Sequence, residues 1–276
     1  MSSVAALVAT AAYVAAAAWP ARRHGDDAPA SDDHAPDTAW WCMAAGWVAQ
    51  AVVLLLDAID WSAVPMQARF GFAPALSVAL WFVLAVYAIE RLQLQSHVVR
   101  RSLAALAAGS VMLAWAFPGQ SHPSLAHGLA PLHWLLGLAS YGLFGAALLH
   151  AVFLRLAERR MRHARLAGQM PRTGIPLLRL ESLTLRFVTA GFVMLTLTLV
   201  LGALFAQPWR WDHKTLLSVL AWGVFAILLA GRHWLGWRGR TAIGWLYAGS
   251  ALLLLAYVGS RFVLEVLLHR APHAAT

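Results

Sequence analysis

Apolar runs of about the length needed to cross a bilayer recur eight times along this 276-residue chain. A transmembrane helix needs roughly 20 mostly apolar residues, and a helix is suited to lipid because it satisfies its own backbone hydrogen bonds. The chain is therefore predicted to be an all-α integral membrane protein, a bundle of about eight transmembrane helices. The predicted spans are 3–20, 39–56, 72–90, 103–117, 133–154, 187–206, 215–231 and 242–268.

The composition supports this prediction. Hydrophobic residues make up 61% of the chain and charged residues only 12%, whereas soluble domains carry about 25% charged residues. The net charge of +9 could indicate a nucleic-acid partner, but the arginines lie in short gaps between apolar runs and form no basic domain. The lipid bilayer is the predicted partner, and nucleic acid is not.

The positive residues also predict the orientation. Of the 21 Lys and Arg residues, 16 fall in alternate gaps and one lies within the last span, which leaves 21 − 16 − 1 = 4 elsewhere. The alternate gaps are 21–38, 91–102, 155–186 and 232–241. Positive loops stay in the cytoplasm, so both termini are expected outside, in a multi-pass protein of the bacterial inner (plasma) membrane. The first span has its positive charges after it, which favours a retained helix over a signal peptide.

The domain organisation predicted is an amino-terminal four-helix membrane region, 1–132, and a second membrane region, 133–276, within one membrane domain overall. An acidic inner linker over 24–38 holds five Asp residues among Pro and Ala, a composition typical of disorder. The single cysteine, Cys42, allows neither an intramolecular disulfide nor a Cys-x-x-Cys redox pair.

Chemistry-bearing residues collect on the predicted outer face. His133 begins the fifth span, the Trp209–Lys214 loop joins the sixth and seventh spans, and His269 follows the last. Imidazole is a common ligand of haem iron, and flat indole rings pack against a porphyrin. The pattern indicates an open haem site. The alternative is that the histidines are polar residues at helix ends near the membrane interface, and that the tryptophans belong to an aromatic belt there.

Two further features have a structural and a functional interpretation. His150 lies 17 residues after His133, about 25 Å along a helix, so it is a candidate second, inner haem ligand or a polar residue near a helix end. Arg261 and Glu265 are four residues apart and share a helix face. They are predicted to form a structural ion pair inside the membrane, and the alternative is that Arg261 contacts a ligand carboxylate.

Three ordered stretches resemble the cytochrome c assembly membrane family, the CcsA/HemX-like proteins. The first runs from Leu132-His133-Trp134 to Ser140-Tyr141, similar to a span with an outward histidine followed by Ser-Tyr. The second stretch, Trp209–Lys214 with Leu220–Trp222, is similar to the family's Trp-rich loop and the helix that follows it. The third, Gly236–Arg240 with Ala256–Gly259, is similar to the family's Gly-Trp-Arg-Gly inner loop and its last helix.

The resemblance implies that two outward histidines flank the Trp-rich loop and bind haem for delivery to apocytochrome c. It makes His133 and His269 the axial ligands of the haem iron. It makes Trp209, Trp211 and Asp212 the platform at the haem edge. The chain departs from the family where His213 replaces a proline and Thr215 a glutamate, and its small size is similar to the HemX-like branch.

The predicted function is cytochrome c assembly or haem handling at the inner membrane, by non-covalent haem binding and without enzymatic activity of its own. Apocytochrome c or another cytochrome c assembly membrane protein is the expected partner, because the chain lacks the cysteines to reduce an apocytochrome. Two alternatives remain at this point. One is a small-molecule permease with Arg261 and Glu265 lining its path, and the other is a structural assembly partner without a cofactor.

Overall fold

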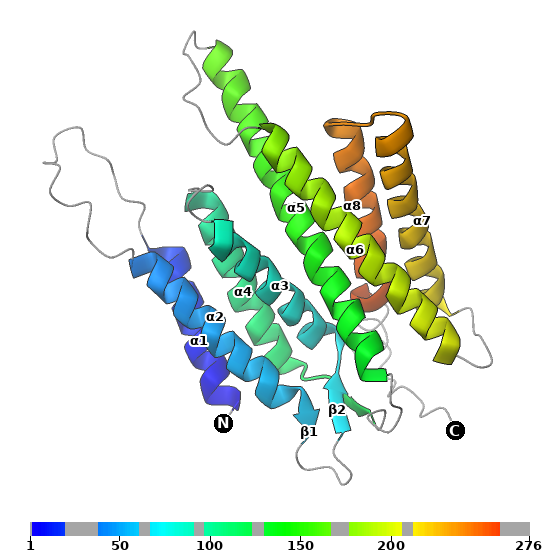
Figure 1. The fold of residues 1–276 in the computed structure, drawn as a ribbon. Coiled ribbons are helices and arrows are strands. Elements are labelled where there is room, and N and C mark those ends of the chain that lie inside the picture. Colours follow the sequence, from blue (N-terminus) through cyan, green and yellow to red (C-terminus); the bar gives the residue numbers. More distant parts are fainter. Residues whose placement is uncertain are drawn as a thin grey trace, which may run out of the picture. The chain divides into compact units, whose positions relative to one another are not determined.

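The computed structural model describes residues 2–19, 38–60, 67–90, 97–122, 130–166, 177–205 and 212–259. Within these ranges the fold is helical, with a small antiparallel sheet and a π turn (Figure 1). The elements are α1 (Ser2–Ala18), α2 (Thr38–Asp57), β1 (Ile59–Asp60), β2 (Gln67–Phe70), α3 (Phe72–Glu90), α4 (His97–Ala116), β3 (Gln120–His122), α5 (Ala130–Leu166), α6 (Leu177–Phe205), α7 (His213–Trp234), α8 (Arg240–Leu254) and the π turn Leu255–Gly259.

The helices confirm a helical membrane protein. Seven described helices, α2 to α8, are long and apolar enough to cross a membrane when α8 is taken together with the π turn. The eighth predicted span corresponds to α1, an apolar helix of 17 residues. A bilayer core needs roughly 20 residues of helix, so α1 is the span whose length fits least well.

The chain forms two compact units. The first unit comprises Met1–Leu84 and Leu94–Pro123, and the second comprises Ala85–Gln93 and Ser124–Thr276. Helices α1, α2, α4 and most of α3 belong to the first unit, together with the sheet. Helices α5 to α8 and the π turn belong to the second.

In the first unit, α1 packs against α2 and α4, and a buried polar network joins α1, α2 and α3. The Tyr13 hydroxyl donates to Gln50 Oε1 over 2.6 Å, and Gln50 Nε2 donates to Ser77 Oγ over 2.9 Å and to the Ser77 carbonyl over 3.1 Å. The side chains of Tyr13 and Gln50 are fully buried. Because each of these polar groups has a partner, the network fixes the register of three helices at little cost in desolvation.

A pair of tryptophans joins α2 to α3 within the same unit. The Trp47 and Trp81 rings stack with their centroids 4.5 Å apart and their planes 7° from parallel. Each indole N–H donates to the other residue's backbone carbonyl over 3.0 Å. Each tryptophan thus satisfies its polar edge on the neighbouring helix while its face packs against the other ring.

A three-stranded antiparallel sheet, in the order β1-β2-β3, lies at one end of the first unit (Figure 1). Ile59 pairs with Ala68, and Arg69 pairs with Ser121. The sequence did not predict this sheet. Strands of two to four residues are too short to show the alternating pattern by which a strand is recognised.

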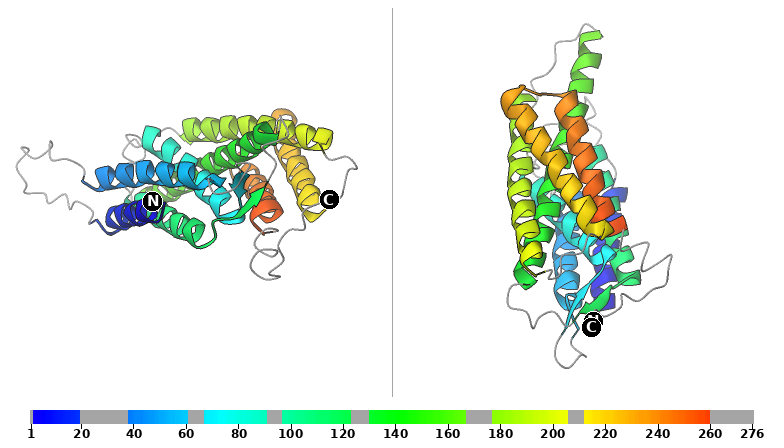
Figure 2. Two further views of the ribbon diagram at one scale, coloured as in Figure 1. Left: turned by 90° about the horizontal axis from the view of Figure 1, so that it is seen from below. Right: turned by 90° about the vertical axis from the view of Figure 1, so that its right-hand side faces the viewer.

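In the second unit, α5 packs on α6, α6 on α7, α7 on α8 and α8 back on α5, which closes a four-helix bundle (Figures 1 and 2). At its centre Phe144 of α5 stacks on Phe225 of α7, with ring centroids 3.9 Å apart. Gly191 of α6 lies against the Phe144 ring, and Gly249 of α8 lies against the Phe225 ring. Small residues at these two positions let all four helices approach one aromatic pair.

The helix ends on the positive side differ from the predicted spans. The gap predicted over 155–186 is mostly helical, because α5 continues to Leu166 and α6 begins at Leu177. Hydropathy predicts where a helix leaves the membrane, not where the helix itself ends. The helices continue beyond that point because Arg, Glu, Leu and Ala also favour helix in water. With 37 residues, α5 is about 55 Å long, so it exceeds a bilayer core of about 30 Å.

Candidate functional site

His133 lies in the first turn of α5 and rests against α6. Its Nδ1 is buried and has no hydrogen-bond partner among the residues that the structure describes. The backbone of Thr198 lies within hydrogen-bonding range of the imidazole. A Cβ added to Gly202 would stand 3.1 Å from His133 Cε1, so the bare glycine is what makes room for the ring. The imidazole is therefore held in place while a nitrogen, which could bind a ligand, stays uncommitted.

Lys214 and Tyr257 stand at the same end of the second unit. The Lys214 ammonium lies over the Tyr257 ring, 5.4 Å from its centroid, and is close enough to act electrostatically on His133. Lys214 belongs to the first turn of α7, and Tyr257 belongs to the π turn that follows α8. Isolated π turns within helices are frequent at functional sites. We call this end, with His133, Lys214 and Tyr257, the His133 end.

Tyr141 lies two turns deeper on α5, and it joins α5 to the base of the π turn. Its hydroxyl donates to the Leu253 carbonyl over 2.7 Å. Its ring lies 6.3 Å from the Tyr257 ring, at an angle of 59°. Tyr141 therefore fixes the turn that presents Tyr257, which gives the Ser140-Tyr141 part of the first stretch a structural role.

Asp212 is the N-cap of α7. Its carboxylate accepts a hydrogen bond from the Thr215 backbone N–H over 2.8 Å, as Asp commonly does at a helix start. Burial acts to raise the pKa of Asp212, but the hydrogen bonds from Thr215 and the charges of Lys214 and His213 outweigh burial and lower that pKa. The carboxylate stays ionised and fixes the turn of α7 that carries Lys214.

His150, the candidate inner ligand, is fully buried near the middle of α5. Its Nδ1 donates to the Ala146 carbonyl over 2.8 Å, and its ring lies 5.0 Å from that of Phe187 on α6. The structure does not bring His150 together with His133. The remaining predicted site residues lie outside the described residues. They are Trp209, Trp211, His269, Arg261 and Glu265.

Trp222, in the second stretch of the resemblance, joins α7 to α6. Its indole N–H donates to Thr196 Oγ1 over 2.9 Å, and its ring stacks on Phe192 with centroids 5.5 Å apart. Both contacts hold the helix that begins at Asp212 against the helix that carries Gly202. Trp222 thus supports the His133 end from within the bundle.

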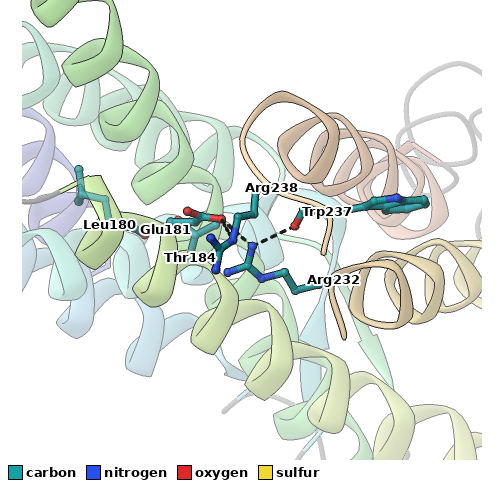
Figure 3. Close-up of polar contacts among 6 residues, drawn as sticks. All are labelled: Leu180, Glu181, Thr184, Arg232, Trp237 and Arg238. Atoms are coloured by element: carbon teal, nitrogen blue, oxygen red, sulfur yellow. Dashed lines mark hydrogen bonds and ion pairs between the residues drawn. The ribbon is translucent and has the colours of Figure 1, made fainter. Parts of the chain in front are cut away.

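The opposite end of the second unit, the arginine end, is organised by Glu181 of α6. Arg232 Nη1 lies 2.8 Å from Glu181 Oε1 and donates to the Trp237 carbonyl over 3.0 Å, and Arg238 Nε lies 3.9 Å from the same Oε1 (Figure 3). The Trp237 ring lies directly on Gly231 and stacks on Trp245. The Gly-Trp-Arg-Gly stretch is therefore a rigid turn between α7 and α8.

Two residues of the His133 end, and the glycine against which His133 rests, were not proposed from the sequence as site residues. Lys214 and Tyr257 stood within the stretches that carry the resemblance, so the sequence did mark them. Gly202 had no such mark, because its contact with His133 exists only once α5 and α6 pack together. Within the described ranges no three His, Cys, Asp or Glu side chains come together as a bare metal site, whereas haem iron needs only one or two protein ligands.

Comparison with known proteins identifies a family over most of the chain. The family described as Cytochrome C assembly protein matches residues 71–268. Inner membrane protein YpjD of Escherichia coli (strain K12) is 34% identical over 141 residues, which are 49% of this chain and 52% of YpjD. Cytochrome c biogenesis protein CcsA of Prochlorococcus marinus (strain MIT 9303) is 36% identical over 86 residues, 29% of this chain and 27% of that protein.

A third relative, CcsA of Cyanophora paradoxa, is 34% identical over 86 residues, which are 29% of this chain and 27% of that protein. The alignments thus span about half of YpjD and about a quarter of the CcsA proteins. No solved structure matches the chain.

Proposed function

This chain belongs to the cytochrome c assembly protein family, and from that premise we propose that it holds haem, non-covalently, at the His133 end of its second unit. It is a multi-pass inner-membrane protein with a role in cytochrome c biogenesis. The observation that carries the proposal is the buried, unpartnered Nδ1 of His133 within the described structure. Leaving a buried polar atom without a partner is costly, and haem iron would supply a partner for this nitrogen.

The other residues at this end fit the same ligand. Haem brings a flat ring, an iron that accepts imidazole and two carboxylate groups. His133 would hold the iron, and Lys214 would pair with a carboxylate from the first turn of α7. Tyr257 offers an aromatic surface that is already in contact with the Lys214 ammonium. Asp212 acts through its cap, as a positioning residue.

The second ligand and the Trp-rich platform are taken from the family resemblance. The connection that holds Trp209 and Trp211 runs from the end of α6 to the start of α7, and both helices have these ends beside His133. In the proposal His269 supplies the second imidazole, and His150 keeps its structural contacts with Ala146 and Phe187. Haem held in this way would pass to apocytochrome c or to a partner assembly protein, without catalysis by this chain.

The proposed orientation places both termini, and so the His133 end, outside the cytoplasm. The alternating positive gaps support it, and reporter fusions after Gly119 and Arg165 should report the outer and inner side, respectively. The permease alternative finds little support in the described bundle, because Phe144 and Phe225 fill its centre. A purified protein that is colourless and carries a solute into vesicles would favour the permease instead.

The test is His133→Ala in the full chain, with haem content and absorption spectrum as the measurements. We expect the haem spectrum to change from six-coordinate towards five-coordinate, and added imidazole to restore it by filling the vacated position. His213→Ala is the matched control, because His213 is exposed in the first turn of α7 at the same end. Unchanged haem content and spectrum in His133→Ala would contradict the proposal.

A further inference from the structure

A cavity of about 440 Å³ lies at the arginine end of the second unit, between the extension of α5 and the start of α8. Its volume is within the range of roughly 300–1,000 Å³ that is typical of ligand sites. None of its residues belongs to the haem proposal. It is lined by Arg155, Glu158, Arg159, Arg162, His163 and Arg240.

The charges around this cavity do not balance. Four guanidinium groups and one carboxylate give 4 − 1 = +3 before His163 is counted. Arg155, Arg159 and Arg162 follow one another at helical spacing on one face of α5. The rule that places positive residues in the cytoplasm accounts for their number, but it does not require them to converge on one cavity from two helices.

Arg240 is placed at a position that is unfavourable for a cation. It is the first residue of α8, where the helix dipole is positive and favours an anion. The rigid turn described above, held by Glu181, Arg232 and the Trp237 carbonyl (Figure 3), ends at Gly239, whose φ of +56° suits glycine. The turn therefore holds Arg240 at the cavity, where a bound anion would compensate for charge that Glu158 alone does not balance.

Arg155 marks the depth of the cavity along α5. Its guanidinium lies over the Tyr247 ring of α8, 5.3 Å from the centroid, which joins the two helices by a cation–π contact. The apolar part of α5 ends just before Arg155, at the level where lipid head groups begin. The stacked rings of Trp237 and Trp245 stand at the same end, as aromatic residues do at membrane interfaces.

We propose that this cavity binds the phosphate of an anionic phospholipid head group. Guanidinium groups match phosphate oxygens in pairs, and basic cavities between transmembrane helices on the cytoplasmic side are known to receive such head groups. The proposal does not depend on haem binding, because the cavity and His133 lie at opposite ends of the bundle.

The experiment is a calorimetric titration of the full chain, in zwitterionic detergent, with short-chain phosphatidylglycerol, phosphatidylcholine and inorganic phosphate. We expect phosphatidylglycerol to bind at least about tenfold more tightly than the other two. Each Arg near a membrane surface contributes about a fivefold factor to the affinity for an anionic lipid. Arg240→Gln should therefore weaken phosphatidylglycerol binding about fivefold, and the double variant Arg159→Gln/Arg162→Gln should weaken it about thirtyfold. All three arginines are exposed, so their replacement leaves no hole in the core.

Arg179→Gln is the matched control, since Arg179 is exposed on α6 at the same end and does not line the cavity. It should leave phosphatidylglycerol binding unchanged. Equal weakening by Arg179→Gln would overturn the proposal in favour of diffuse attraction. Equally tight binding of inorganic phosphate would overturn it in favour of a soluble anion. Haem content should stay at the wild-type level in every variant, which separates this test from that of the haem site.

Discussion

Gln50 in the first unit and His133 in the second are both polar side chains on apolar helices, and they differ in their partners. Gln50 is fully buried, and its amide is hydrogen-bonded on both sides, to Tyr13 and to Ser77. His133 is half-buried, and its Nδ1 has no partner in the described part of the chain. Polar groups of the first kind fix helices in place, whereas a buried group of the second kind costs free energy until a partner is supplied. The difference separates Gln50, whose hydrogen bonds join three helices, from His133, whose Nδ1 has no partner in the described structure.

The largest expected effect tests this comparison directly, by replacing each residue with leucine. Gln50→Leu should lower the free energy of unfolding by about 2 kcal/mol, because the Tyr13 hydroxyl loses its acceptor in a dry interior. His133→Leu should leave the stability of the haem-free protein unchanged or slightly raised, since it removes an atom that had no partner. Thermal unfolding in detergent, followed by circular dichroism, measures both variants. A clear loss of stability in haem-free His133→Leu would assign His133 to the structural class.

The sequence predicted the membrane-spanning helices more closely than the structure outside the membrane. The apolar pattern located α2 and α3 to within a residue, because hydropathy is decided by each residue and its neighbours. It missed the extension of α5 to Leu166, where helix and membrane end at different places. It also missed the sheet formed by β1 to β3, whose pairing joins segments far apart in the chain.

For the candidate site, residue type and family resemblance singled out His133 and Asp212. They did not predict the burial or the hydrogen-bond partners of either side chain. The missing partner of His133 Nδ1 depends on how α5 packs against α6, and so does the need for glycine at position 202. Asp212 was expected to form part of the haem-edge platform, and the structure gives it a second role as the cap of α7. An Asp just before an apolar run is an N-cap pattern that could have been recognised.

A smaller effect is expected from a methyl group beside the imidazole. In Gly202→Ala the new Cβ would stand 3.1 Å from His133 Cε1, so the ring must move by a few tenths of an ångström and haem affinity should fall several-fold. Gly223→Ala is the matched control, because a Cβ there meets nothing within 4 Å. Both changes favour the helix by about 0.5–1 kcal/mol, and in Gly202→Ala the displaced ring offsets part of that gain. Only Gly202→Ala should lose haem in a titration. Equal haem affinities would show that the ring position does not matter.

The smallest effect is expected at Asp212, which tests whether the cap or the charge supports the His133 end. Asn caps a helix about as well as Asp, so Asp212→Asn should change stability and haem affinity by a few tenths of a kcal/mol at most. Asp212→Ala, which removes the acceptor for the Thr215 N–H, should cost about 1 kcal/mol. Thermal unfolding and haem titration of the two variants, side by side, measure the difference.

The pH dependence provides a second measurement of the same cap. The pKa of Asp212 is lower in the folded protein than in the unfolded chain, so its contribution to stability is fully present above the unfolded value of about 3.9 and is lost as the pH falls through the folded pKa. Wild type and Asp212→Asn should therefore differ in the acid dependence of unfolding below about pH 4 and agree at neutral pH. If Asp212→Asn instead loses haem strongly at neutral pH while its stability is unchanged, the carboxylate itself serves the ligand. Asp212 would then belong with His133 among the groups that the ligand completes.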